Sequence, residues 1–155
     1  MNTTILAIAD QFAHQGQIVN LKAFGNGNIN DTFLVNLDDQ AQTCFVLQRI
    51  NHHVFPKPAA VMGNMVRVTE HIHRKLATNP LDRPWQMPKV IFTKTGQDHW
   101  RSPTGDYWRA ISFIEGSESF DALTSLHQAR EVGTALGLFH QLLSDLPPSQ
   151  LTDTL

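Results

Sequence analysis

The chain has 155 residues, of which 41% are hydrophobic and 17% are charged. This length and composition are typical of one folded domain with a single core, and they exclude a disordered chain. The formal net charge of −2, from 12 basic and 14 acidic side chains, gives no basic surface for binding nucleic acid or an anionic membrane. One cysteine, Cys44, and no basic leader followed by an apolar segment predict a cytoplasmic protein.

The first half of the chain predicts a helix, three strands and a long helix. A short amphipathic helix begins at Thr3 or Thr4 and is expected to stop at Gly16. Apolar residues recur every three or four positions from Val61 to Leu76, so a long helix is expected to pack on the sheet. The three strands between these helices form an antiparallel meander and are expected at residues 17–24, 30–37 and 43–50.

The second half adds two strands and one more helix. Strands are predicted at residues 89–93 and 107–114, with a hairpin turn at 103–106 between them. Gly116 breaks the pattern, and an apolar stripe over residues 125–143 predicts the last helix. The sequence therefore predicts an α+β fold with an antiparallel sheet of about five strands and a long helix packed on it.

Two glycines, Gly25 and Gly27, lie between the first two predicted strands. Glycine lacks a Cβ and tolerates positive φ, so this hairpin tip can bring backbone N–H groups close to a phosphate. Asn-Gly between alternating apolar residues is also the strongest ordinary hairpin signal, and that turn needs no ligand. The hairpin alone leaves both interpretations open.

The element order and several short motifs resemble the N-terminal lobe of the aminoglycoside phosphotransferase and choline kinase superfamily, whose members are protein-kinase-like. The resemblance covers residues 18–155, and GNINDT at 27–32 joined to LQRIN at 47–51 is similar to the N-acetylhexosamine 1-kinase branch. The motifs that carry it are Gly25-x-Gly27-x-x-Asn30, FVLQRIN at 45–51 with Val54-Phe55, Trp108-Arg109, and FIEGS at 113–117.

The resemblance implies an activity and a division of the chain. Enzymes of this kind transfer the γ-phosphoryl group of ATP, held with Mg²⁺, to a hydroxyl group. Residues 1–116 would then form the nucleotide-binding lobe, and residues 117–155 the connector and first helix of a C-terminal lobe. The acceptor implied is a small-molecule hydroxyl, that of an N-acetylated hexosamine at its anomeric carbon, and the partners are ATP and this acceptor.

The resemblance also implies a nucleotide-binding site. Gly25, Gly27, Asn28 and Asn30 would form a phosphate loop, Thr32 and Val46 the floor of the adenine pocket, and Ser112, Phe113, Ile114 and Glu115 the connector that holds the base. The lysine of the family's third strand aligns with Gln48, so either Gln48 or Arg49 is expected to contact phosphate, with Glu70 on the next helix as the positioning acid.

Several of these assignments have a plainer alternative. Val46, Phe113 and Ile114 can be ordinary core residues, because the apolar lining of a pocket looks the same in sequence. Glu70 can be a solvated acid on a helix face. Asn30 stands where the protein-kinase pattern has its third glycine, which implies a less flexible loop tip.

The carboxylates needed for phosphoryl transfer are not found in the expected patterns. In the family they follow the last predicted helix, and Asp121, Asp145 and Asp153 lie in no His-x-Asp or Asp-x-Asp pattern. We therefore expect no catalytic or metal-binding residue in this chain, which would be an inactive N-terminal fragment of a kinase. The alternative is a non-catalytic nucleotide- or partner-binding module that forms a homodimer through its exposed lobe face.

Overall fold

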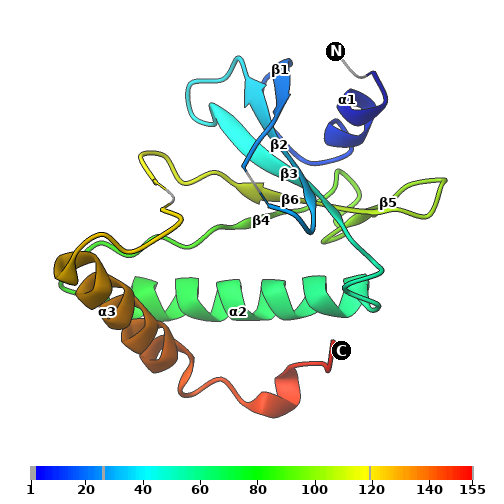
Figure 1. Ribbon diagram of the computed structural model, residues 1–155. Helices are drawn as coiled ribbons and strands as arrows, with labels where there is room; N and C mark the ends of the chain where they lie inside the picture. The colour runs from blue at the N-terminus through cyan, green and yellow to red at the C-terminus, as the bar shows by residue number, and fades with distance from the viewer. Residues whose placement is uncertain (1–2, 26, 119, 155) are drawn as a thin grey trace.

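The chain forms an α+β fold in which one antiparallel sheet lies between two helices (Figure 1). The computed structural model describes residues 3–25, 27–118 and 120–154. In chain order the elements are α1 (Thr3–Ala9), β1 (Ile18–Ala23), β2 (Asp31–Leu37), β3 (Cys44–Ile50), α2 (Pro58–Thr78), β4 (Val90–Ile91), β5 (Trp100–Arg101), β6 (Tyr107–Ser112), α3 (Leu126–Leu143) and the 3-10 turn η1 (Pro148–Gln150).

The strand order places β3 in the middle of the sheet. The order is β1-β2-β3-β6-β4, all neighbours are antiparallel, and β5 also pairs with β6. Thr32, Gln48 and Arg109 lie directly opposite one another across β2, β3 and β6. Directly opposite residues share a face of the sheet, so these three side chains form one row.

Helix α1 covers one face of the sheet and forms the main hydrophobic core there (Figure 1). The strands contribute alternate residues to this face, as a period of two requires. Apolar burial of this kind is the principal stabilising term of the fold. The buried members of this core are Ile8, Ala9, Phe12, Val35, Leu37, Phe45, Leu47, Trp108 and Ala110.

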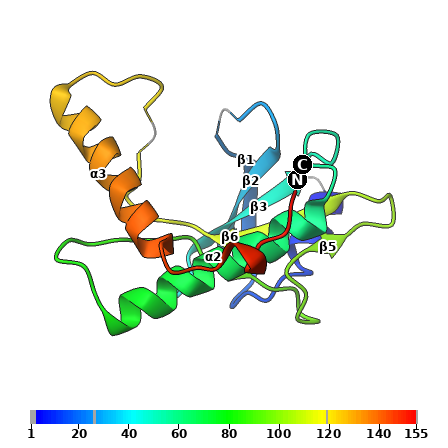
Figure 2. The ribbon, with the colours of Figure 1, turned by 90° about the horizontal axis from the view of Figure 1, so that it is seen from below.

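Helix α2 crosses the opposite face (Figure 2). Pro58 occupies its first turn, where the missing N–H costs no helical hydrogen bond. Met62 and Ile72 are fully buried on the helix, while Val46 and Ile50 are buried on β3. This face is the one that carries the row of Thr32, Gln48 and Arg109, because Arg109 contacts α2.

Helix α3 lies away from the sheet and packs against one end of α2 (Figures 1 and 2). Its N-cap is Ser125, whose side chain accepts a hydrogen bond from the Gln128 N–H. After the helix, Asp145 accepts bonds from Lys75 Nζ at 2.7 Å and contacts His71 Nε2 at 3.0 Å. The chain then returns along α2, where Asn64 exchanges two hydrogen bonds with the Thr152 backbone at 2.7 and 2.9 Å.

The α+β fold with a long packed helix, predicted above, is confirmed, with differences at element ends. The sheet has six strands where about five were expected, because β5 pairs with β6 beyond the 103–106 turn. Helix α1 ends at Ala9 before Gly16, since the backbone of residues 11–13 instead bonds to residues 92–94. Within the described residues, no helix is long and apolar enough to cross a membrane.

Candidate functional site

The glycine hairpin is closed at its base and open at its tip. The Phe24 N–H donates to the Thr32 carbonyl at 2.9 Å, and Gly25 follows with φ of +78°. That left-handed conformation favours glycine. A Cβ built at Gly25 or Gly27 would meet no atom within 4 Å, so both positions face open space.

The two asparagines of the predicted phosphate loop lie in different settings. The Asn30 Oδ1 accepts a hydrogen bond from the Asn51 N–H at 2.9 Å, and this bond ties the hairpin to the turn after β3. Asn28 lines a cavity of about 370 Å³ together with Arg49 and Asp106. Asn30 therefore has a structural partner, and Asn28 faces a space that a small polar group can enter.

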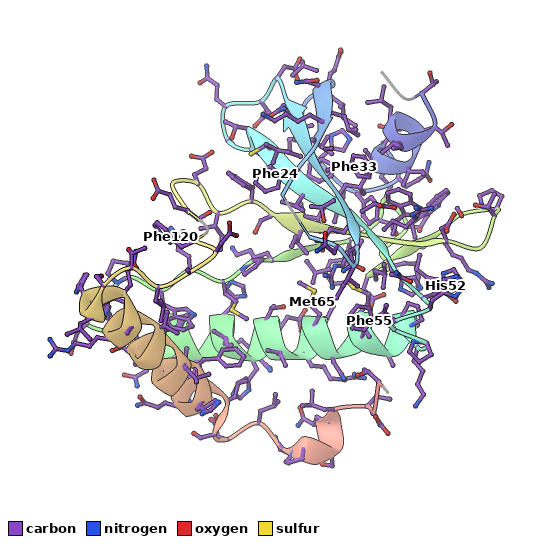
Figure 3. The ribbon with its side chains drawn as sticks, in the orientation of Figure 1. Phe24, Phe33, His52, Phe55, Met65 and Phe120 are labelled. Atoms are coloured by element: carbon purple, nitrogen blue, oxygen red, sulfur yellow. The ribbon has the colours of Figure 1, made fainter. Side chains whose placement is uncertain are left out.

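Gln48 links β2 to β6 on the face toward α2. Its Nε2 donates to the Thr32 Oγ1 at 2.9 Å, and its Oε1 accepts from the Arg109 Nε at 2.9 Å. The Arg109 Nη1 reaches the Met65 Sδ on α2 at 3.5 Å, and Figure 3 shows Met65 between the helix and the sheet. Val46, buried, precedes Gln48 by two residues on the same face. A row of polar side chains therefore runs from the hairpin strand to α2.

Arg109 is a half-buried cation. Burial lowers the pKa of its guanidinium below the usual value because the charged form loses hydration. Arginine nevertheless stays protonated near neutral pH. Among the described residues no acid forms an ion pair with Arg109, so its charge is not offset by a carboxylate.

Arg49 lies on the opposite face of the sheet. Its Nε donates to the Asp31 Oδ2 at 2.7 Å, and its Nη1 lies 3.7 Å from the Asp106 Oδ1. The side chain lines a cavity of about 930 Å³ beneath α1, with Trp100 and Trp108. Gln48 and Arg49 thus face opposite sides, and of the two only Gln48 lies with Thr32 and α2.

Glu70 is exposed and lies apart from both of these residues. It lines a cavity of about 380 Å³ with His73 and Lys89 near β4. In the part of the chain that the structure describes, no hydrogen bond or ion pair joins Glu70 to Gln48 or Arg49. Met65, also on α2, contacts the row through Arg109, and the sequence analysis did not assign it to the site.

The predicted connector is attached to both neighbouring strands. The Ser112 N–H donates to the Lys89 carbonyl at 2.9 Å, and the Ser112 Oγ accepts from the Lys89 N–H at 2.9 Å. The Glu115 Oε1 accepts from the Thr43 Oγ1 at 2.7 Å, just before β3. These bonds hold the start and the end of the connector against the sheet.

An aromatic contact joins the connector to the glycine hairpin. The rings of Phe24 and Phe113 meet edge to face, with centroids 5.7 Å apart, and Figure 3 shows Phe24 at the end of β1. The Ile114 carbonyl accepts from the Ser117 Oγ at 2.8 Å and so closes the turn that follows. The two segments predicted to hold a base and its phosphates are therefore side by side.

Asp145, an acid near the end of the chain, is held by a lysine and a histidine of α2. Among the described residues, no group of three His, Cys, Asp or Glu side chains is placed to hold a metal ion. Hydrogen bonds from Lys75 and then His71 lower the pKa of Asp145 from 3.8 to about 2, so this acid is a structural ion-pair partner.

Comparisons with known proteins agree with this geometry. The model of the phosphotransferase enzyme family matches residues 20–155. A solved structure, amicoumacin kinase hAmiN in complex with AMP-PNP, Ca²⁺ and Ami, superimposes with a TM-score of 0.67 at 13% sequence identity. The match covers 94% of this chain and 41% of that kinase, so the chain spans less than half of its length. Because the family model matches most of its residues, this chain belongs to the phosphotransferase enzyme family.

Proposed function

We propose that this chain is the nucleotide-binding lobe of an ATP-dependent kinase that phosphorylates a small-molecule hydroxyl. The observation that carries the proposal is the contact between the Gly25 hairpin and the connector at Phe113. A base held by the connector would place its phosphates beside Gly25 and Gly27, where the Cβ positions face open space and glycine lets backbone N–H groups approach an anion.

The division of the chain follows from the same assignment. Residues 1–116 hold the sheet, the hairpin and the connector, and residues 117–155 hold α3, which leaves the sheet. We assign the first part to nucleotide binding and the second to the start of a C-terminal lobe. The proposed acceptor, an N-acetylated hexosamine, rests on the motifs GNINDT and LQRIN alone.

The proposed cofactor is ATP with Mg²⁺. The described residues suit the nucleotide, but they offer no set of ligands for the magnesium ion. The glycine hairpin and the row of Thr32, Gln48 and Arg109 suit an anionic nucleotide. The acids of the described residues form no cluster suited to Mg²⁺, so we assign no magnesium ligand and no transfer step to them. Nucleotide binding without turnover is the property expected of this chain.

A titration of the ¹⁵N-labelled chain with AMP-PNP, followed by NMR, tests the proposal. Chemical shifts of Gly25, Gly27 and residues 112–115 should change together, while the turn at Gly96 serves as the internal reference. Gly96 has φ of +80° and an open Cβ position like Gly25, but it lies in the turn after Thr93. Absence of shifts at the hairpin and connector would overturn the proposal.

A second candidate is a non-catalytic module that pairs with another copy of the chain. One observation favours it: Val132 and Leu136, neighbours one turn apart on α3, are 57% and 55% exposed. Contiguous apolar side chains on a surface are a recognised association site. Sedimentation equilibrium of the wild type and of Leu136→Glu tests this candidate. Pairing through α3 predicts a wild-type dimer that the charged variant disrupts, and a wild type that stays monomeric at all concentrations contradicts pairing.

A further inference from the structure

We propose that Arg109 supplies the positive charge that binds the nucleotide phosphates in this chain, and that Gln48 orients it. This inference rests on the proposed function and identifies the residue that contacts the nucleotide phosphates. In protein kinases the phosphate-contacting cation is a lysine on the third strand. Here that strand carries Gln48, whose amide is uncharged, so the charge must come from elsewhere.

The register of the sheet places Arg109 directly beside Gln48, the position of the kinase lysine. Gln48 and Arg109 lie directly opposite each other on β3 and β6, and the Arg109 Nε donates to the Gln48 Oε1 at 2.9 Å. The other end of the Gln48 amide bonds to Thr32, on the strand that follows the glycine hairpin. Because both ends of the amide are bonded, Gln48 holds the guanidinium in one orientation beside the hairpin strand.

Arg109 differs from four other basic side chains in having no carboxylate partner among the described residues, and from the remaining ones in being partly buried. Each of the following basic side chains contacts a carboxylate: Arg49, Lys75, Arg83 and Lys94. Among the described residues, Arg109 has no such acid and contacts only the weak acceptor Met65 Sδ beyond Gln48. A partly buried guanidinium without a counter-charge is costly, and a phosphate group would offset that cost.

One nitrogen of the guanidinium, Nη2, has no hydrogen-bond partner among the described residues. The Nε and Nη1 make the contacts just described, and no described residue accepts a hydrogen bond from Nη2. The side-chain atoms that are both fully buried and unbonded lie elsewhere, on His14, Trp85 and Trp108, so Nη2 keeps some contact with solvent. Guanidinium groups bind phosphate oxygens through strong, directional hydrogen bonds.

The test compares a ligand that carries phosphates with one that does not. NMR titrations of the 155-residue chain measure the dissociation constants of AMP-PNP and adenosine for the wild type and Arg109→Met. We expect the variant to bind AMP-PNP about tenfold more weakly or worse, and adenosine within about twofold of the wild type. A methionine there packs beside Met65, which keeps the fold intact.

Two further variants separate charge from structure. Gln48→Lys combined with Arg109→Met returns a cation to β3, and we expect it to recover most of the AMP-PNP affinity. Arg101→Met is the matched control, because Arg101 is an exposed arginine on β5 that lies over the Tyr107 ring. This control should bind both ligands like the wild type.

The outcomes distinguish the inference from the proposed function. If the wild type binds AMP-PNP and Arg109→Met binds it equally well, the inference is wrong and the proposed function stands. If Arg109→Met loses AMP-PNP and adenosine to the same extent, Arg109 has only a structural role and the inference is likewise overturned. If the wild type binds neither ligand, both the proposed function and the inference fail.

Discussion

Truncation of Met62 to alanine should strongly destabilise the chain and loosen α2 from the sheet. Met62 is 0% exposed and lies one turn before Met65, which contacts Arg109 on the sheet, so the two methionines share one face of α2. Replacing a fully buried methionine by alanine costs about 2–5 kcal/mol of the free energy of unfolding, through lost burial and the cavity left behind. A domain of this size is stable by about 5–15 kcal/mol, so a large share of its stability would be lost.

The assay is urea denaturation followed by circular dichroism, with thermal unfolding as a second measurement. The expected loss corresponds to a fall in Tm of about 4–20 °C, at about 2–4 °C for each kcal/mol in a chain of this length. The slope of the urea transition should stay unchanged, since the surface exposed on unfolding is nearly the same.

Leu136→Ala is the matched control for Met62→Ala. It removes the same number of heavy atoms from a helix, but Leu136 on α3 is 55% exposed. Its expected cost is about 0.5 kcal/mol or less, as for other surface substitutions. If Met62→Ala costs no more than Leu136→Ala, then α2 is not packed on the sheet as described, and the position of the row beside Met65 is wrong as well.

Three other predictions follow from single contacts. Hydrogen bonds from Lys75 and His71 lower the pKa of Asp145 from 3.8 to about 2. The ionised acid therefore contributes its full stabilisation above pH 3.8, and this contribution is lost as the pH falls through about 2. Urea midpoints between pH 5 and pH 2 should therefore fall less in Asp145→Asn than in the wild type, and equal falls would contradict this. Gly25→Ala and Gly96→Ala should each cost about 1–2 kcal/mol, because both positions have positive φ, but only Gly25→Ala should weaken AMP-PNP binding in an NMR titration. Thr32→Val removes the acceptor of the Gln48 amide and should lower the free energy of unfolding by about 1 kcal/mol; an unchanged urea midpoint would refute that bond.

Local patterns were sufficient to predict most elements of the fold. The three-and-four spacing of apolar residues predicted α2 and α3, and the Asn-Gly turn predicted the β1–β2 hairpin. Alternation along β3 predicted that Gln48 and Arg49 face opposite sides, and their contacts lie on opposite sides of the sheet. These features follow from interactions between residues close in sequence, which is why the sequence carries them.

Tertiary pairing decided the features that were missed. The end of α1 at Ala9 depends on hydrogen bonds to residues 92–94, and β5 exists because it pairs with β6. Arg109 was noticed only as part of a motif, since its contact with Gln48 joins residues 61 apart in sequence. No local spacing predicts that β6, among the later strands, is the one beside β3.

The sequence by itself therefore determined the type and order of the elements and the face on which each β3 side chain lies. Only the tertiary structure decided which side chains meet on that face: Arg109 and Met65 contact the row, and Glu70 lies outside it. The physical reason is that helical and strand periodicity are set by backbone geometry within each segment, whereas strand order and helix docking are set by burial of apolar area shared between distant segments.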